Sequence, residues 1–272
     1  MRRTHATGLI LLAFILLGWL LPAAVPAAVV GAMTQVEGQV EILKGGKLPA
    51  VPAKVKDGLE PLDMIRTKSK SRAQVRFIDD TLLTIAPSSS IVIQEYMYDG
   101  AKGSRQATLQ LSRGLVYTVI NRIHKTEQPD FIMKTHTAVL GVRGTRFFSL
   151  VGVKYTAFFQ EVGLTEVGNV SPAIPQRVKL VGQEYSIVKT ARPPLPPRRL
   201  TEADLMRLRQ WLKDGVPERF LQFDPVDSLW EPPPPRSTVL PPGPVGPERL
   251  PEGLFKPPTL GPSPGHTPHH PL

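Results

Sequence analysis

The chain of 272 residues contains no cysteine. This absence excludes disulfide-stapled scaffolds, thiol nucleophiles, iron–sulfur clusters, thiolate zinc sites and an anchor that carries lipid on a cysteine. The sequence also has no P-loop, no dinucleotide fingerprint and no Gly-x-Ser-x-Gly element around a serine. We therefore expect a protein that is not an enzyme and that carries no cofactor.

Paired catalytic carboxylates and metal-binding histidines are also lacking. A glycan-processing enzyme remains an alternative, but it needs two converging carboxylates, and the adjacent Asp79 and Asp80 point apart if they form a turn. His124 and His136 have no further ligand at a suitable spacing. The remaining candidates are His266, His269 and His270, which lie among prolines. Flexibility there argues against a specific site, so we predict no metal centre.

Proline is abundant but unevenly placed. Of the 30 prolines, 15 fall in residues 231–272, where they remove backbone donors from helices and central strands. We expect this tail to be disordered. Residues 33–190 are long enough to bury the core of one ordinary domain without disulfides.

The first 32 residues are typical of an export signal. Arg2 and Arg3 precede an apolar run from Leu9 to Leu21, and small residues follow it. Cleavage after Ala27 or Ala32 fits this pattern; the alternative is an uncleaved segment that associates with the membrane. Either reading predicts a periplasmic protein, or one that is secreted or held at the cell surface.

The formal net charge is +10. For an exported protein, the acidic counterparts are envelope proteins and anionic envelope polymers, and nucleic acid is not an expected partner. The alternative is a basic surface that serves solubility alone.

Between residues 33 and 190 the sequence consists of short alternating segments separated by turn residues, which is typical of an all-β sandwich, barrel or solenoid. In Ala73–Ile78, for example, alternate residues are apolar, and Asp79-Asp80 supplies the following turn. The predicted strands are 35–43, 59–66, 73–78, 81–86, 91–98, 108–111, 115–120, 130–135, 145–150, 154–161, 177–181 and 185–189.

The segment from Phe131 to Gly163 is the most informative. Alternation places Phe147, Ser149 and Val151 on one strand face and Arg146, Phe148 and Leu150 on the other. The run Val142-Arg-Gly-Thr-Arg-Phe147, together with residues 62–67, 73–90, 109–117 and 131–138 in the same order, resembles the FecR-like domain. Asp80 stands where that family usually has glycine, and Asp tolerates turn conformations well.

The resemblance implies an antiparallel all-β domain on the far side of the inner membrane. Better-known members carry a cytoplasmic anti-sigma segment before a transmembrane helix and a docking domain at the end. Few residues precede the apolar run here, and no second αβ pattern follows Lys189. We therefore expect neither of those parts in this chain.

A proline spacer and one amphipathic helix are predicted after the β domain. Residues 191–200 favour polyproline II, and residues 201–230 contain the helix and its extension. Thr201 is the expected N-cap. The apolar stripe either docks on the chain's own sheet or binds a partner, and its residues are Leu205, Leu208, Trp211 and Leu212.

The sharpest local motif runs from Arg143 to Phe147. Gly144 is suited to a positive φ, after which Arg143 projects a guanidinium. One reading is a structural turn that ties strands together, and the other is a recognition corner for anions. The candidate residues are Arg143, Gly144, Thr145, Arg146 and Phe147.

These features favour a non-enzymatic periplasmic or cell-envelope protein that binds or scaffolds through its β domain. The alternative from another class is an accessory sensor in transmembrane signalling, related to FecR-type anti-sigma regulators.

Overall fold

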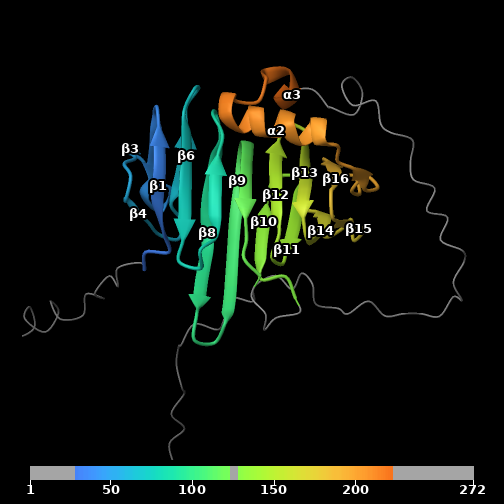
Figure 1. Ribbon diagram of the computed structural model, residues 1–272, viewed down its shortest axis with the longest axis horizontal. Coiled ribbons are helices and arrows are strands. Elements are labelled where there is room, and N and C mark those ends of the chain that lie inside the picture. Colours follow the sequence, from blue (N-terminus) through green and yellow to red (C-terminus); the bar gives the residue numbers. More distant parts are fainter. Residues whose placement is uncertain (1–27, 123–127, 223–272) are drawn as a thin grey trace, which may run out of the picture.

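The structure is a computed structural model that describes residues 28–122 and 128–222. The predicted export segment up to residue 27, the predicted helix extension from residue 223 and the proline-rich tail lie outside the described residues. The described chain is built mainly of strands, which confirms the all-β prediction (Figure 1). Within residues 28–122 and 128–222, no helix is both long enough and apolar enough to cross a bilayer.

Seventeen strands and three helices occur in the described chain. The first strands are β1 (Gly31–Glu37), β2 (Val40–Leu43), β3 (Val51–Pro52), β4 (Gly58–Leu59), β5 (Met64–Thr67), β6 (Arg72–Phe77), β7 (Leu82–Ile85), β8 (Ser90–Asp99) and β9 (Ser104–Val119). The others are β10 (Phe131–Lys134), β11 (Ala138–Val142), β12 (Arg146–Val151), β13 (Tyr155–Val162), β14 (Leu164–Asn169), β15 (Arg177–Val181), β16 (Glu184–Lys189) and β17 (Arg198–Arg199). The helices are the 3₁₀ turn η1 (Lys44–Gly46), α2 (Glu202–Asp214) and α3 (Glu218–Gln222).

The strands form two sheets that share β9. Sheet A has the order β4-β1-β6-β7-β9-β12-β13-β16-β17. Sheet B has the order β3-β2-β5-β8-β9-β10-β11-β14-β15. The first part of β9 pairs in sheet B and the part from Gly114 onward pairs in sheet A. Gly114 has a φ of +90° at this change of sheet, a conformation that L side chains rarely adopt.

One pair of strands departs from the antiparallel prediction. β10 runs parallel to β9, with Phe131 opposite Ala107. The reason is that the chain leaves β9 in sheet A and re-enters sheet B beside the start of the same strand. A connection that returns to the start of a strand produces a parallel neighbour.

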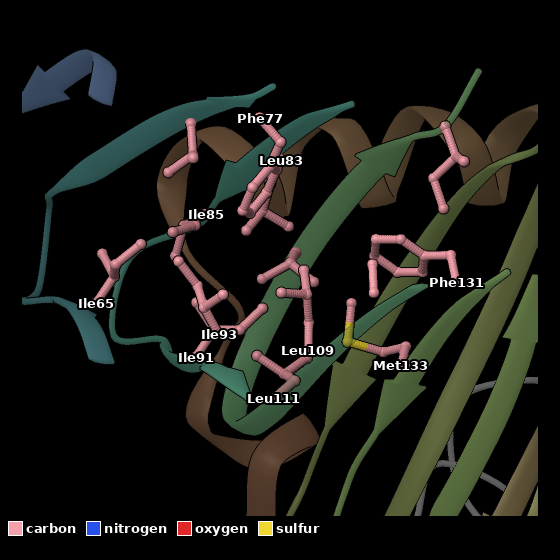
Figure 2. Close-up of a cluster of buried hydrophobic side chains, with 14 of the residues drawn as sticks. Ile65, Phe77, Leu83, Ile85, Ile91, Ile93, Leu109, Leu111, Phe131 and Met133 are labelled. Atoms are coloured by element: carbon pink, nitrogen blue, oxygen red, sulfur yellow. The ribbon is translucent and has the colours of Figure 1, made fainter. Parts of the chain in front are cut away.

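The main core lies between the two sheets. Inward residues from both sheets form one buried cluster, including Phe77, Leu83 and Ile85 from sheet A and Leu109 and Met133 from sheet B (Figure 2). Alternation supplies these residues, since every second side chain of each strand points inward.

A second core lies on the outer face of sheet A. Phe148 and Leu150 of β12 belong to it, whereas Phe147 and Val151 belong to the main core. This division confirms the two faces predicted from alternation. The helix α2 runs across the ends of β9, β12 and β13, and α3 lies next to α2 (Figure 1). Residues of both helices pack into this core and cover it.

The apolar stripe of α2 is buried in that second core. Leu205, Leu208 and Trp211 are 1%, 0% and 7% exposed, and Leu212 packs partly against them. Thr201 forms the predicted N-cap, in a capping box with Asp204. Of the two alternatives for the stripe, docking on the chain's own sheet is the one observed, and the partner-helix reading of these four residues is corrected accordingly.

The predicted proline spacer is also packed. Leu195 and Leu200 contribute to the second core, and β17 pairs with β16 inside the spacer range. Residues 191–200 therefore lie against sheet A and do not form a free spacer. A second short helix, α3, follows α2, where the sequence predicted only one.

Candidate recognition surface

The motif at residues 143–147 forms the corner where the chain passes from sheet B to sheet A. Gly144 has a φ of +60°, as predicted, and a Cβ there would lie 2.5 Å from Cβ of Arg122. The backbone carbonyl of Thr145 accepts a hydrogen bond from the Ile120 amide at 2.9 Å. Phe147 is buried in the main core. These contacts support the structural reading of the corner at Gly144, Thr145 and Phe147.

The two arginines of the motif lie outside the core. Arg146 is exposed on β12, next to a bulge in its pairing with β13. Arg143 is half-buried and lines a hollow of about 180 Å³ on the outer face of sheet B. The other lining residues come from the 128–130 segment and three adjacent strands, and they are Pro129, Gly141, Leu164, Thr165, Glu166 and Lys179.

The register of sheet B explains the position of this hollow. Gly141 of β11 lies opposite Glu166 of β14, and Glu166 lies opposite Lys179 of β15. The three residues therefore form one row across the sheet, and Gly141 contributes no side chain to it. The absent side chain leaves space between Arg143 and the centre of the row.

Two basic groups and one acidic group surround the hollow. Arg143 and Lys179 both line it, so a basic residue from outside the motif, far from Arg143 in the sequence, lies beside it. Glu166 is 12% exposed and lies 3.5 Å from Nε of Arg177. Burial raises the pKa of Glu166, and the charges of Arg177 and Lys179 oppose this rise. The surface is thus basic, with one carboxylate held between cations.

Among residues 28–122 and 128–222, α2 and α3 cover the outer face of sheet A and leave that of sheet B uncovered. The strand residues of the second core all belong to sheet A, so α2 and α3 cover that sheet and not sheet B. Around the hollow, exposed apolar side chains lie beside the basic groups, with Leu164 and Val181 exposed by 52% and 61%. This combination of apolar and cationic groups is suited to binding a partner that carries negative charge.

A buried ionic network, which the sequence did not reveal, joins the strands β8 and β9 to the β6–β7 connection and to the residue before β10. Arg105 of β9 donates to Asp79 at 2.6 Å and to Asp130 at 2.8 Å. The side chains of all three are at most 3% exposed. Tyr96 and Thr81 also donate to Asp79, at 2.6 and 2.7 Å.

This network holds Asp79 in the ionised state. Burial alone raises the pKa of Asp79, but hydrogen bonds from Tyr96, Arg105 and Thr81 outweigh it, so that the pKa is lowered. Asp80 instead takes a φ of +63° at the turn and pairs with Arg76 on the surface at 2.8 Å. The two carboxylates point apart, as predicted, and Asp79 serves the fold.

Histidine and metal chemistry find no support in the described chain. His136 is exposed, and its Nε2 lies 3.1 Å from the carbonyl oxygen of Val153. In residues 28–122 and 128–222 no group of three or more His, Asp or Glu side chains is arranged to hold a metal. His124, His266, His269 and His270 lie outside the described residues.

Two of the solved structures that resemble the chain share one description. Both are crystal structures of a "putative anti-sigma factor from Parabacteroides distasonis ATCC 8503", at 2.50 and 1.65 Å resolution. Each is 18% identical to this chain, with TM-scores of 0.43 and 0.42. The matches cover 55% and 54% of this chain but only 63% and 64% of those proteins, so the chain spans less than two thirds of their length. A likeness of this size carries no conclusion about function.

The family comparison is more specific. None of the curated proteins compared with the chain matches it. Residues 63–162 match the model of the family described as FecR protein, and this range runs from the turn before β5 to the end of β13. The motif at Arg143–Phe147 lies within the match, whereas Lys179 of the hollow lies beyond it. The chain therefore contains a FecR domain, which spans residues 63–162.

Proposed function

We propose that this chain is a non-enzymatic protein of the cell envelope that binds an envelope protein or an anionic envelope polymer. In this proposal the binding surface is the outer face of sheet B around the Arg143 hollow. The protein is exported by its N-terminal segment and works in the periplasm or at the cell surface.

The observation that carries the proposal is the contrast between the two outer sheet faces. On sheet A, Phe148, Leu150 and Tyr185 are buried beneath α2 and α3. On sheet B, Leu164, Lys179 and Val181 are exposed. Where the described part of the chain covers one face and leaves the other exposed, with apolar groups among charges, that face is a candidate surface for another molecule.

The chemistry of this surface favours binding over catalysis. The carboxylate at the hollow, Glu166, is held near Arg177, and the buried Asp79 and Asp130 are both bound to Arg105. A cationic rim attracts acidic groups and gives specificity through charge. Anionic polymers of the envelope and acidic segments of envelope proteins both fit this description.

Fractionation followed by binding measurements tests the proposal. A tagged chain should be found outside the inner membrane, in the periplasmic or envelope fraction. Purified protein should sediment with envelope material, and Arg143→Glu should reduce the bound fraction at least tenfold. Lys47→Glu makes the same change of charge at the exposed β2–β3 connection, at the other end of sheet B, and should have no effect. A cytosolic location, or equal binding by both variants, would contradict the proposal.

A second candidate function, an accessory sensor in transmembrane signalling, is favoured by the FecR match at residues 63–162. In this reading the same surface binds a transporter or ligand and a separate membrane partner carries the signal inward. Deleting the gene would then change transcription that depends on one sigma factor, and neighbouring genes would encode that factor and a transporter. Unchanged transcription would favour the binding role alone.

A further inference from the structure

Two neighbouring turns carry exposed aliphatic side chains. Val162 and Leu164 belong to the turn between β13 and β14, and Val181 begins the turn between β15 and β16. Their side chains are 46%, 52% and 61% exposed. Leu164 lies directly opposite Val181 in the pairing of β14 with β15, so these two side chains adjoin. We call this apolar tip, formed by the three residues, the paired turns.

Buried contacts hold the paired turns in place. Nε2 of the buried Gln160 donates to the carbonyl oxygens of Gly163 at 2.7 Å and Gly182 at 3.1 Å. The Gly182 amide donates to the Gly163 carbonyl at 3.1 Å, and a Cβ on Gly163 would overlap Cγ2 of Thr145. The two turns are therefore fixed to each other and to the corner at Thr145. A surface that is already ordered loses little conformational entropy when it makes a contact.

Basic side chains lie beside the paired turns. Lys179 is exposed two residues before Val181 on β15. Arg146 is exposed and lies opposite Val162 in the pairing of β12 with β13. Arg143 lines the adjacent hollow. Aliphatic groups surrounded by cations suit a surface that is apolar inside and negatively charged outside.

Two carboxylates beside the turns bind within the protein. Oη of Tyr117 donates to Glu161 at 2.6 Å, and Arg209 forms an ion pair with the same carboxylate. Oε2 of Glu184 accepts from the Val181 amide at 2.9 Å. The charge of Glu161 is thus balanced by Arg209, and Glu184 is directed back onto its own turn.

The described chain enters sheet A at the end that bears the paired turns. One row of directly paired residues crosses the sheet from the start of β1 to the end of β13: Ala32, Arg76, Leu82, Val119, Arg146 and Val162. At the opposite end of β13, Oη of Tyr155 donates to the Phe220 carbonyl of α3, and Figure 1 shows α2 and α3 together at that end.

The apolar N-terminal run therefore precedes this end of the sheet. Six residues, 22–27, separate the run Leu9–Leu21 from the first described residue. Such a segment spans at most about 20 Å when fully extended. If the run is retained in a membrane, the bilayer surface lies within reach of the end that bears the paired turns.

We infer that the paired turns dock on the surface of a lipid bilayer that contains anionic lipids. Val162, Leu164 and Val181 enter the boundary between headgroups and acyl chains, and the basic residues beside them contact lipid phosphates. This inference goes beyond the proposed function, because the partner is lipid and because Val162 and Val181 lie outside the Arg143 hollow.

A single dye label tests the inference, because the chain has no cysteine of its own. Val181→Cys carries nitrobenzoxadiazole, whose emission shifts to shorter wavelength in an apolar environment. The matched control is Val170→Cys, an exposed valine that follows the far end of β14. With the purified full-length chain and vesicles of phosphatidylcholine and phosphatidylglycerol in equal parts, the label at 181 should shift and the label at 170 should not. Vesicles of phosphatidylcholine alone should give a smaller shift.

A second substitution in the labelled chain tests the apolar contact. Val162→Ser should lower the ratio of docked to undocked protein about fivefold, because part of one aliphatic side chain no longer leaves water. Val153→Ser makes the same change at an exposed valine of the β12–β13 turn, at the end near α3, and should leave the ratio unchanged.

Four results would overturn the inference. They are no shift at position 181, equal shifts at 181 and 170, equal effects of Val162→Ser and Val153→Ser, and a shift that grows with protein concentration in the absence of vesicles. The last result would mean that the paired turns bind a second copy of the chain.

The failure of this inference is distinguishable from the failure of the proposed function, because the vesicles contain no envelope protein or polymer. If position 181 does not shift while Arg143→Glu still reduces sedimentation with envelope material, only the membrane contact is wrong. If position 181 shifts while Arg143→Glu has no effect on sedimentation, only the proposed binding surface is wrong.

Discussion

Removing the positive charge at Arg105 should destabilise the fold strongly. Arg105→Met keeps most of the apolar volume of the side chain but leaves two buried carboxylates without their cation. Asp79 retains the donors Tyr96 and Thr81. Asp130 loses both its ion pair and its hydrogen bond to the guanidinium, and its second oxygen already has no partner.

The magnitude follows from the burial of all three groups. Breaking a buried ion pair by removing one partner costs about 3–5 kcal/mol, because an uncompensated charge remains inside. A protein of this size has a total stability of about 5–15 kcal/mol, so the loss is a large fraction of it. At about 2–4 °C per kcal/mol, the expected fall in melting temperature is about 6–20 °C.

Urea unfolding followed by circular dichroism measures this loss, and Arg76→Met is the matched control. Arg76 pairs with Asp80 at 2.8 Å, but the two side chains are 58% and 64% exposed. Exposed pairs contribute about 0–1 kcal/mol, so this variant should stay close to the unsubstituted protein. A difference between the two variants below about 1 kcal/mol would refute the assignment of Arg105 as a buried structural cation.

Three further predictions concern the fold. Gly144→Ala should lower the free energy of unfolding by at least about 1 kcal/mol more than Gly182→Ala. Both glycines have positive φ, but only a Cβ on Gly144 would meet other atoms. Comparable unfolding free energies of the two variants would contradict this. Leu208→Ala should lower the free energy of unfolding, measured by chemical denaturation, by about 2–5 kcal/mol. Met206→Ala, on the exposed side of α2, should lower it by about 0.5 kcal/mol or less. An equally small loss for both variants would mean that α2 does not dock on sheet A. The pKa of Asp79 is lowered in the folded state, so its contribution is complete above the ordinary value of 3.8 and is lost as the pH falls through the folded value. The stability difference between the unsubstituted protein and Asp79→Asn should therefore shrink in acid, and a constant difference from pH 7 to pH 2 would contradict the shift.

The alternation of inward and outward residues made most strands of the two sheets predictable. Strands such as Arg177–Val181 and Arg72–Phe77 match their predicted ranges closely, because inward and outward residues must alternate wherever one face is buried. The strands β11 and β14 were missed. Both contain a glycine, Gly141 and Gly168, a residue that weakens a strand pattern in sequence, whereas here the glycines lie inside paired strands.

Features of the candidate site that depend on one residue were predictable, whereas contacts between residues far apart in the sequence were not. Positive φ at Gly144 follows from the residue itself. The position of Lys179 beside Arg143 depends on the intervening pairing of β14 with both neighbours, which no local pattern shows. The same is true of the contact between Arg105 and its two carboxylates, each about 25 residues away along the chain.

Photocrosslinking in intact cells tests the central claim most directly. A photoreactive phenylalanine analogue replaces Leu164 beside the hollow or, as the control, Met206 on α2, two exposed apolar positions on opposite outer faces. The account predicts a discrete adduct with an envelope component from position 164 and none from position 206. An adduct from position 206 alone, or none from position 164, would contradict the assignment of the open face of sheet B as the recognition surface.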